Sequence, residues 1–509
     1  MKLFTIGDSI SQGFMSAAAA RTDLSYSTLL SKILNAENYC YPAWAKDGLP
    51  VNIETVFRRL EKRLGANISG PLEWPIALNI INNYLDEVED FYERGEGWPA
   101  TAFTGNCFHN VAVRGFDVAY SWLIKPDLAR QMINKSKSNE DNWWGMVDEP
   151  LLRTALRVLE TGSDGKLANP SQLDWLKYHH QTEGVENLVL WLGANNALGT
   201  VLSLKINQTS NDGKAFADGP QHVDYETRKK KGWNLWHPED FRAEYQYMIN
   251  KVVDIMEANE HNVDYKVFIA TIPLVTIAPL IKATGGQQDR QMIQVTEWIV
   301  DEDNPAPMDV NELPLPVVDK EYSYGKYYPY FPFSDNFEIT LPHLNLSQVV
   351  HIDDTIRKYN RIIQEIVATA NKRVGSKRFY LVDIGTALSK MALKRNLYNP
   401  DYKYPAFFQY AYPKVDTRYY GTSRKGEIMS GGIFSLDGVH PTAIGQGLIA
   451  YEFLKVMKKA NSFHGDPENT INWNAIFIND ELYSKPLKLI NEIYDNISLK
   501  KWLFQIISK

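Results

Sequence analysis

The stretch LFTIGDS at residues 3–9 decides the fold of this chain. A short apolar run ends at Gly7 and two small polar residues, which is typical of a buried strand that leads into a functional loop. The apolar pattern of Leu24 to Leu34 then predicts a helix. A strand, a loop and a helix in this order form the opening unit of an α/β protein.

Three further apolar runs predict buried strands, namely Glu186–Leu192, Tyr265–Ile272 and Arg378–Ile384. Between them, Phe241–Met256 and Thr355–Asn371 carry apolar residues at helical spacing. Short apolar strands that alternate with amphipathic helices predict a parallel sheet covered by helices on both faces. In such sheets, ligands bind outside the carboxyl ends of the strands.

Small and polar residues gather in four segments that we place near these strand ends. They are GDSISQG at 7–13, NVAVRG at 110–115, GANN at 193–196 and DGVHPT at 437–442. Acyl transfer to a serine needs a hydroxyl, an imidazole that takes its proton, a carboxylate that orients the imidazole, and donors for the oxyanion. The four segments supply each of these groups once.

These segments, in this order, resemble the SGNH hydrolase family, the GDSL-type lipases and esterases. The resemblance implies that Ser9 is the nucleophile, His440 the base and Asp437 the carboxylate that orients it. It also implies an oxyanion hole formed by the Ser9 N–H, the Gly115 N–H and the Asn195 side chain. The implied fold is a flavodoxin-like three-layer α/β/α arrangement with a central parallel sheet and large insertions.

Two residues beside these positions need separate interpretation. The family usually has Asp directly after the asparagine of the third segment, whereas this chain has Asn196, so we expect the local hydrogen bonding to differ. Asp8 precedes the predicted nucleophile, and we interpret it as shaping the turn rather than taking part in catalysis.

Other kinds of site are not indicated. GxSxG, HExxH and GxxxxGK[ST] motifs do not occur in the chain. The residues closest to a metal cluster are His179, His180 and Glu183, but adjacent histidines on a helix point in different directions. We therefore expect neither a metal nor another cofactor.

The charge pattern and the apolar runs bear on partners. There are 54 basic and 61 acidic residues without a long block of one sign, which does not indicate nucleic-acid binding. The best candidate for a membrane span, Val267–Ile281, is short and contains Pro273 and Pro279. Without a visible signal peptide, the sequence leaves open a cytoplasmic protein and the mature form of a secreted or periplasmic one. It also leaves the oligomeric state open.

The four segments are scattered from residue 7 to 442, so we expect one catalytic domain over residues 1–460 and a C-terminal extension, 461–509, packed on it. The expected insertions are about 36–105, 126–185, 200–239, 276–349 and 391–429. Aromatic residues make up 12% of the chain, and many lie in these insertions. Examples are Trp98, Trp143, Trp144, Trp175, Trp233, Trp236 and the cluster at 322–333. We expect the insertions to influence substrate choice.

The sequence thus predicts a serine ester hydrolase that acts through an acyl-enzyme on Ser9. Its substrate is either a small or carbohydrate acyl ester, which stacked aromatic rings would suit, or a lipid ester. A lipid ester requires an apolar channel, for which the loop Val275–Ile281 and the 322–333 cluster are candidates. The alternative is a non-catalytic binding or scaffolding protein that retains the fold.

Overall fold

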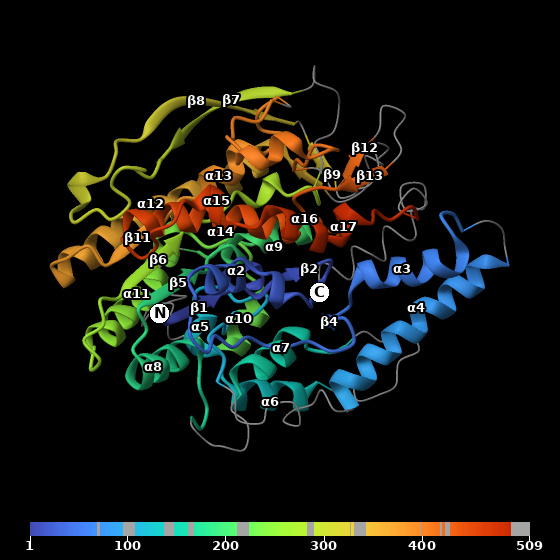
Figure 1. Ribbon diagram of the computed structural model, residues 1–509, viewed down its shortest axis with the longest axis horizontal. Coiled ribbons are helices and arrows are strands. Elements are labelled where there is room, and N and C mark those ends of the chain that lie inside the picture. The colour runs from blue at the N-terminus through green and yellow to red at the C-terminus, as the bar shows by residue number, and fades with distance from the viewer. Residues whose placement is uncertain are drawn as a thin grey trace.

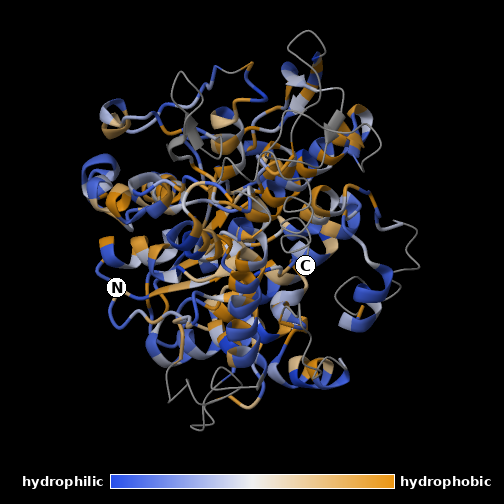
Figure 2. Ribbon diagram, turned by 90° about the vertical axis from the view of Figure 1, so that its right-hand side faces the viewer, coloured by the Kyte–Doolittle hydropathy of each residue, from blue (hydrophilic) through white to orange (hydrophobic). Residues whose placement is uncertain are grey.

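A central parallel sheet organises the protein in the computed structural model. Its four strands lie in the order β1 (Leu3–Gly7), β5 (Asn187–Trp191), β6 (Lys266–Ala270) and β11 (Phe379–Val382). All are fully buried, and apolar ribbon fills the centre of Figure 2. The four predicted strands are therefore confirmed. The structure describes residues 1–68, 72–94, 107–136, 147–160, 167–210, 223–281, 290–325, 327–329, 343–397, 399–417, 420–422 and 428–489.

Helices flank this sheet (Figure 1). One group contains α2 (Tyr26–Ile33) and α14 (Ala443–Lys459), and another contains α8 (Gln172–Glu183), α11 (Pro238–Glu257) and α12 (Leu346–Val374). The three helices expected from the sequence correspond to α2, α11 and α12, which confirms them. The protein is thus an α/β protein whose architecture is compatible with a three-layer α/β fold.

Side chains of β1 show that the two groups lie on opposite faces of the sheet. The ring of Phe4 lies 5.1 Å from that of His179 on α8. The next residue, Thr5, is hydrogen-bonded through Oγ1 to Ser27 on α2 at 2.7 Å. Because successive side chains of a strand point to opposite faces, α8 and α2 cover different sides. The ring of Tyr26 also stacks on that of Phe453, at 5.0 Å between centroids, which joins α2 to α14.

A further segment extends the sheet beyond β1. Residues 109–113 run parallel to β1, with a bridge between Thr5 and Asn110. The Thr5 N–H donates to the carbonyl of His109 at 2.8 Å, and the Val113 N–H donates to that of Gly7 at 3.1 Å. The segment that ends at Gly115 therefore lies directly beside β1, which leads to Ser9.

The other elements surround this core. The first half of the chain contains α1 (Ser9–Gln12), β2 (Phe14–Met15), β3 (Ala18–Ala19), η1 (Thr22–Leu24), β4 (Leu49–Pro50), α3 (Ile53–Leu64), α4 (Glu73–Glu89), η2 (Asp90–Arg94), α5 (Tyr120–Leu123), α6 (Pro126–Lys135), α7 (Pro150–Leu159), α9 (Asn195–Ser203) and α10 (Tyr225–Lys231). The second half contains η4 (Val275–Ile277), β7 (Gln291–Glu297), η6 (Val310–Glu312), β8 (Val317–Tyr324), β9 (Tyr327–Pro329), β10 (His343–Asn345), α13 (Ile384–Met391), η7 (Ala406–Tyr410), β12 (Tyr420–Thr422), β13 (Ile428–Gly431), α15 (Pro467–Thr470), α16 (Trp473–Asn479) and α17 (Glu481–Ser484). Among the described helices, none is both long and apolar enough to cross a membrane.

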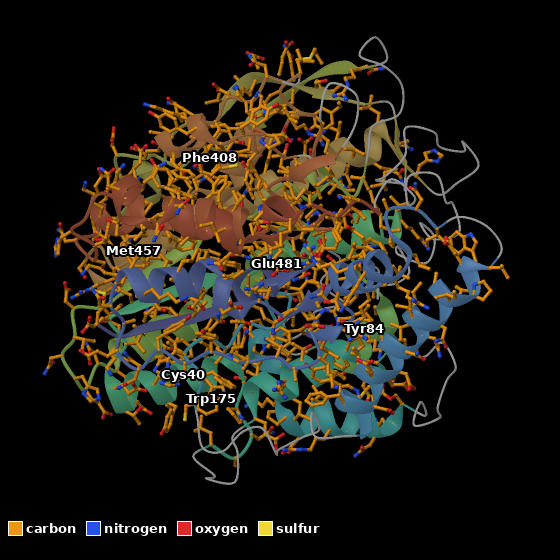
Figure 3. The ribbon with its side chains drawn as sticks, turned by 45° about the vertical axis from the view of Figure 1, so that its right-hand side comes forward. Cys40, Tyr84, Trp175, Phe408, Met457 and Glu481 are labelled. Atoms are coloured by element: carbon orange, nitrogen blue, oxygen red, sulfur yellow. The ribbon has the colours of Figure 1, made fainter. Side chains whose placement is uncertain are left out.

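A second hydrophobic cluster holds the hairpin of α3 and α4 against the core (Figure 3). Tyr84 is buried in it, and its hydroxyl accepts a hydrogen bond from the Asn52 N–H at 3.3 Å. The cluster also contains Leu436, from the segment before the predicted Asp437, and Leu482 of α17. This hairpin therefore packs against parts of the chain that follow residue 430.

The C-terminal extension packs on the body as far as the structure describes it. Phe408 of η7 contacts the ring of Trp473 on α16 at 5.1 Å, and the Ile444 N–H of α14 donates to the carboxylate of Asp480 at 3.0 Å. Residues 490–509 lie outside the described residues, as do Trp98, Trp143 and Trp144. Trp175 and Trp236 are buried in the main core.

A buried ion network supports the turn after β5. The guanidinium of Arg228 donates to the carboxylates of Asp117 at 2.8 Å and Glu244 at 2.7 Å. All three residues are almost completely buried. Glu244 also accepts a hydrogen bond from the Asn196 side chain at 3.3 Å. The network therefore joins α10 and α11 to the segment that carries Asn195.

Replacement of Arg228 tests this network. Arg228→Met removes the cation between two buried carboxylates, and we expect the free energy of unfolding to fall by about 3–5 kcal/mol. Lys229→Met is the matched control, because Lys229 forms an exposed ion pair with Glu149 and should contribute less than about 1 kcal/mol. Denaturant titration of both variants checks this expectation. Equal losses in the two variants would contradict it.

Candidate active site

The turn after β1 presents Ser9 at the start of α1. Asp8 caps this helix, because its Oδ1 accepts a hydrogen bond from the Ile10 N–H at 3.0 Å. Gly7 is required by close packing, since a Cβ atom there would lie 2.1 Å from Oγ of Ser11. The turn holds Ser9 at the carboxyl end of β1 with 5% of its surface exposed.

Asp437 organises the loop that carries His440. Its Oδ1 accepts the backbone N–H groups of Val439 and His440, each at 2.9 Å. Its Oδ2 accepts the Ala17 N–H and lies 2.9 Å from Nδ1 of His440. An aspartate three residues before a histidine can thus close a tight loop and fix the imidazole at once.

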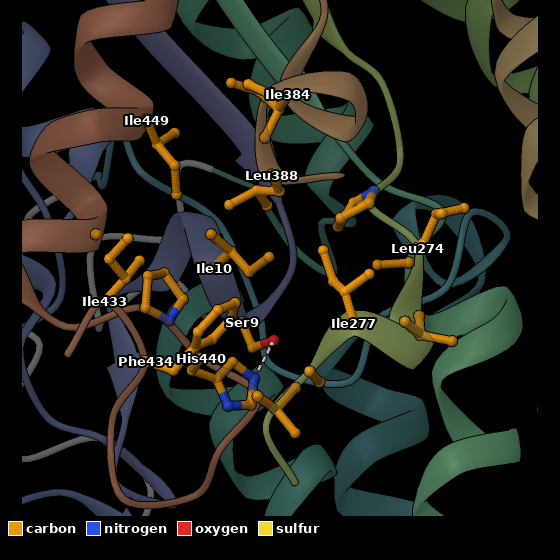
Figure 4. A pocket seen from close by; sticks show the side chains of 18 of the residues that line it. Ser9, Ile10, Leu274, Ile277, Ile384, Leu388, Ile433, Phe434, His440 and Ile449 are labelled. Carbon is orange, nitrogen blue, oxygen red and sulfur yellow. Dashed lines mark hydrogen bonds between the residues drawn. The ribbon is translucent and has the colours of Figure 1, made fainter. Parts of the chain in front are cut away.

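The structure brings Ser9, His440 and Asp437 together as the sequence predicted. Nε2 of His440 lies 2.8 Å from Oγ of Ser9 (Figure 4). Because Asp437 accepts from Nδ1, the imidazole proton belongs on Nδ1, and Nε2 can accept the hydroxyl hydrogen of Ser9. This arrangement is the hydrogen-bonded chain that a serine nucleophile requires.

The charge of Asp437 is stabilised despite its burial. Burial by itself would raise the pKa of this carboxyl, but the adjacent His440 imidazole and the backbone N–H groups of His440 and Ala17 outweigh that effect, so its pKa lies below the ordinary value. Asp437 is therefore ionised at neutral pH. A permanent negative charge at this position would favour the protonated form of the imidazole if Ser9 gave up its hydrogen to it.

Asn195 and Gly115 lie at the ends of the two segments beside β1. The Asn195 side-chain amide donates to the carbonyl of Phe116 at 2.9 Å and to Oδ2 of Asp8 at 3.3 Å. Gly115 has φ +75°, which disfavours other residues. Among the described residues, neither the Ser9 N–H nor the Gly115 N–H has a hydrogen-bond acceptor. Two backbone donors thus remain available for an anionic oxygen.

The structure explains why an asparagine stands at position 196. Its Oδ1 accepts the Val118 N–H at 3.2 Å, and its Nδ2 donates to the buried carboxylate of Glu244 at 3.3 Å. An aspartate would place a second negative charge against Glu244. The local hydrogen bonding of Asn196 thus includes an acidic residue on α11, and its difference from the family stays a prediction.

The pKa of the Asp8 carboxyl is shifted in the opposite direction to that of Asp437. Burial raises the pKa of the Asp8 carboxyl to about 7, although the Ile10 N–H and His440 oppose this effect. Its N-cap bond agrees with the predicted role in shaping the turn. Its contact with Asn195 adds a role that the sequence did not indicate, because this carboxyl holds one of the predicted oxyanion donors.

Sequence reasoning missed several contacts of the site. The ring of Phe14 lies 4.6 Å from that of His440, and the Leu280 N–H donates to the carbonyl of Gly438 at 3.0 Å. The Ala17 N–H, which holds Asp437, was also missed. These groups belong to segments far apart in the chain and carry no motif, so the sequence has no local signal for them.

A histidine cluster lies elsewhere, beside β1. His109, His179 and Glu183 place possible ligand atoms within 4.8 Å of one another. However, Nδ1 of His109 accepts the Cys40 N–H at 3.0 Å, so the proton of a neutral ring lies on Nε2, which faces Glu183 at 3.5 Å. A nitrogen that carries hydrogen cannot bind a metal. The geometry fits hydrogen bonds to the Glu183 carboxylate, and His180 points instead to the carbonyl of Met256.

Comparisons of the chain with protein-family models, with curated proteins and with solved structures found no match in any of the three. The interpretation of the site therefore depends on its own geometry.

The raised pKa of Asp8 predicts how stability depends on pH. Between about pH 4 and pH 7 the folded protein retains the Asp8 proton that the unfolded chain has lost, so this residue makes stability fall as pH rises through that window. Asp8→Asn keeps a capping side chain but cannot ionise. We expect its Tm, relative to that of the wild type, to be higher at pH 8 than at pH 5. An equal Tm difference at both pH values would contradict the assignment.

Proposed function

We propose that this protein is a serine ester hydrolase of the SGNH, GDSL-type, kind. The observation that carries the proposal is the chain of hydrogen bonds from Oγ of Ser9 through His440 to Asp437, at 2.8 and 2.9 Å. The same types of residue form the acylating apparatus of serine hydrolases on unrelated folds. The identified geometry and the resemblance in sequence support the same reaction.

The order of the strands gives additional support. With residues 109–113 beside β1, the parallel segments lie in the order second, first, third, fourth and fifth along the chain, which is the flavodoxin-like order. In that order the topological switch point lies between the first and third segments, here β1 and β5. Ser9 and Asn195 follow these two strands, where such folds bind their ligands.

Acylation would proceed as follows. His440 accepts the hydroxyl proton of Ser9 on Nε2 while Oγ attacks the ester carbonyl carbon. The negative charge that develops on the carbonyl oxygen is stabilised by the N–H groups of Ser9 and Gly115 and by the Asn195 amide. In the free protein the Asn195 amide donates one hydrogen to Asp8, and during the reaction this hydrogen would be donated to the oxyanion instead. Protonated His440 gives its proton to the leaving alcohol, and the acyl group remains on Ser9.

Deacylation repeats these steps with water. His440 accepts a proton from a water molecule that attacks the acyl carbon, the same donors stabilise the second oxyanion, and the proton returns to Oγ of Ser9. Asp437 holds the imidazole in place in both halves and stabilises its charged form. The products are a carboxylic acid and an alcohol.

Replacement of the nucleophile tests the proposal. We expect Ser9→Ala to lower kcat for p-nitrophenyl butyrate hydrolysis by on the order of 10⁴- to 10⁶-fold, because no other group can form the acyl-enzyme. Ser11→Ala is the control, since Oγ of this buried neighbour contacts the hydroxyl of Tyr26 instead. A fluorophosphonate probe should label Ser9 in the wild type. Absence of both labelling and hydrolysis would favour the non-catalytic binding protein.

Removal of one oxyanion donor should lower kcat separately from removal of the nucleophile. Asn195→Ala removes one donor, and we expect kcat to fall by about 10²- to 10³-fold with little change in KM, because the bond is made mainly in the transition state. Steady-state kinetics on the same ester measures both constants. A reduction below about threefold would show that the Asn195 amide is not an oxyanion donor.

A further inference from the structure

An aliphatic cavity opens beside Ser9. The space between its atoms, open solvent included, is about 820 Å³, and Ser9, Asn195 and His440 are among the residues that line it. Figure 4 shows Ser9 and His440 close together in this space. Apart from these two residues, Asn195, Asp8 and Glu452, every described residue of its wall is apolar. Besides the His440 imidazole, Phe434 provides the only aromatic ring of this described wall. A surface of this kind suits hydrocarbon rather than a sugar, which needs polar partners or stacked rings.

Helix α14 forms one wall of the cavity, and its rise per residue gives the length of that wall. It begins directly after the loop of His440, and its Gly445, Leu448, Ile449 and Glu452 line the wall. Their spacing places them on one helix face. Because a helix rises 1.5 Å per residue, the lined face extends over about 10 Å. Figure 4 shows Ile384 and Ile449 at the end of the cavity away from Ser9.

A polar boundary limits the far end. Ala387 and Glu452 also line a neighbouring cavity whose walls are rich in charged and tyrosine side chains. The carboxylate of Glu452 accepts hydrogen bonds from the hydroxyl of Tyr402 at 2.6 Å and from Lys455 at 2.7 Å. Hydrocarbon that reached beyond this point would remove water from an ion pair, which is unfavourable.

We propose that this cavity binds the acyl chain of the substrate, a straight chain of medium length, and that Ala387 and Ile449 set the length. An extended chain advances roughly 1.2 Å per bond, so a lined depth of about 10 Å holds about eight carbons. The acyl half remains on Ser9 while the alcohol must leave before water attacks, and this favours placing the acyl half in the cavity. The inference depends on the proposed ester hydrolysis.

Esters of graded length test the wild-type protein. In a p-nitrophenyl series from acetate to palmitate, kcat/KM should rise roughly threefold to fourfold per methylene up to about eight carbons and then level off or fall. Acetate esters of alcohols of increasing length should show no such rise. An optimum at acetate, or a rise that follows the alcohol instead, would overturn the proposal.

Variants at the far end test the residues that set the length. Ala387→Phe should lower the ratio of kcat/KM for octanoate over butyrate by roughly tenfold or more, because the ring fills the space of the last carbons. Ile449→Ala should move the optimum toward longer chains. Lys390→Phe is the matched control, since Lys390 lies on the same helix but lines only the neighbouring polar cavity. Unchanged ratios in both cavity variants would overturn the role of these residues.

Labelling with a fluorophosphonate distinguishes failure of the acyl cavity from failure of the proposed ester hydrolysis. A wild type whose Ser9 reacts with a fluorophosphonate and that hydrolyses acetate esters best would retain the proposed function and lose only the acyl cavity. A wild type that neither reacts with the probe nor hydrolyses any ester would overturn both the proposed function and the acyl cavity. Ile449→Ala deletes atoms rather than adding them, so it keeps the test valid if Ala387→Phe does not fold.

Discussion

The carboxylate of Asp437 makes the contacts on which the rest of the site depends. One oxygen closes its own loop, and the other joins the Ala17 N–H to the imidazole of His440. The Ser16 N–H donates nearby to Oγ of Ser435 at 2.8 Å. The loop of His440 is thereby fixed to the segment that follows Ser9. Because these segments lie more than 400 residues apart, the short distance from Ser9 to His440 exists only in the assembled fold.

Two buried carboxyl groups lie within this site, and their surroundings give them different properties. Asp437 is surrounded by N–H donors of the backbone and of the His440 imidazole, which lower its pKa despite burial. Asp8 is also fully buried, but burial dominates and raises its pKa. A second permanent anion beside Asn195 would oppose the negative oxygen of the proposed ester intermediate. The protein avoids this conflict in part because burial disfavours the charged form of Asp8.

The walls of the cavity come mainly from segments around the sheet rather than from the aromatic insertions. Val275, Ile277 and Ala278, in the loop considered for an acyl channel, line it. Tyr322 and Tyr324 of the aromatic cluster are buried elsewhere, and the guanidinium of Arg395 lies 4.2 Å from the ring of Tyr324. Of that cluster, residues 326 and 330–333 lie outside the described residues. For the described part, these tyrosines stabilise the insertion instead of contacting the cavity.

The sequence by itself determined the strands, the turn at Ser9 and the loop at His440, because apolar runs, glycine and an aspartate three residues before a histidine act over short distances. Only the tertiary structure decided which side chains from distant segments contact these strands and loops. It brought Glu244 to Asn196, which accounts for the amide there. It also placed α13 beside α14 to form an aliphatic cavity. Such contacts depend on which helices pack against one another, and the helical periodicity of the chain does not specify those partners.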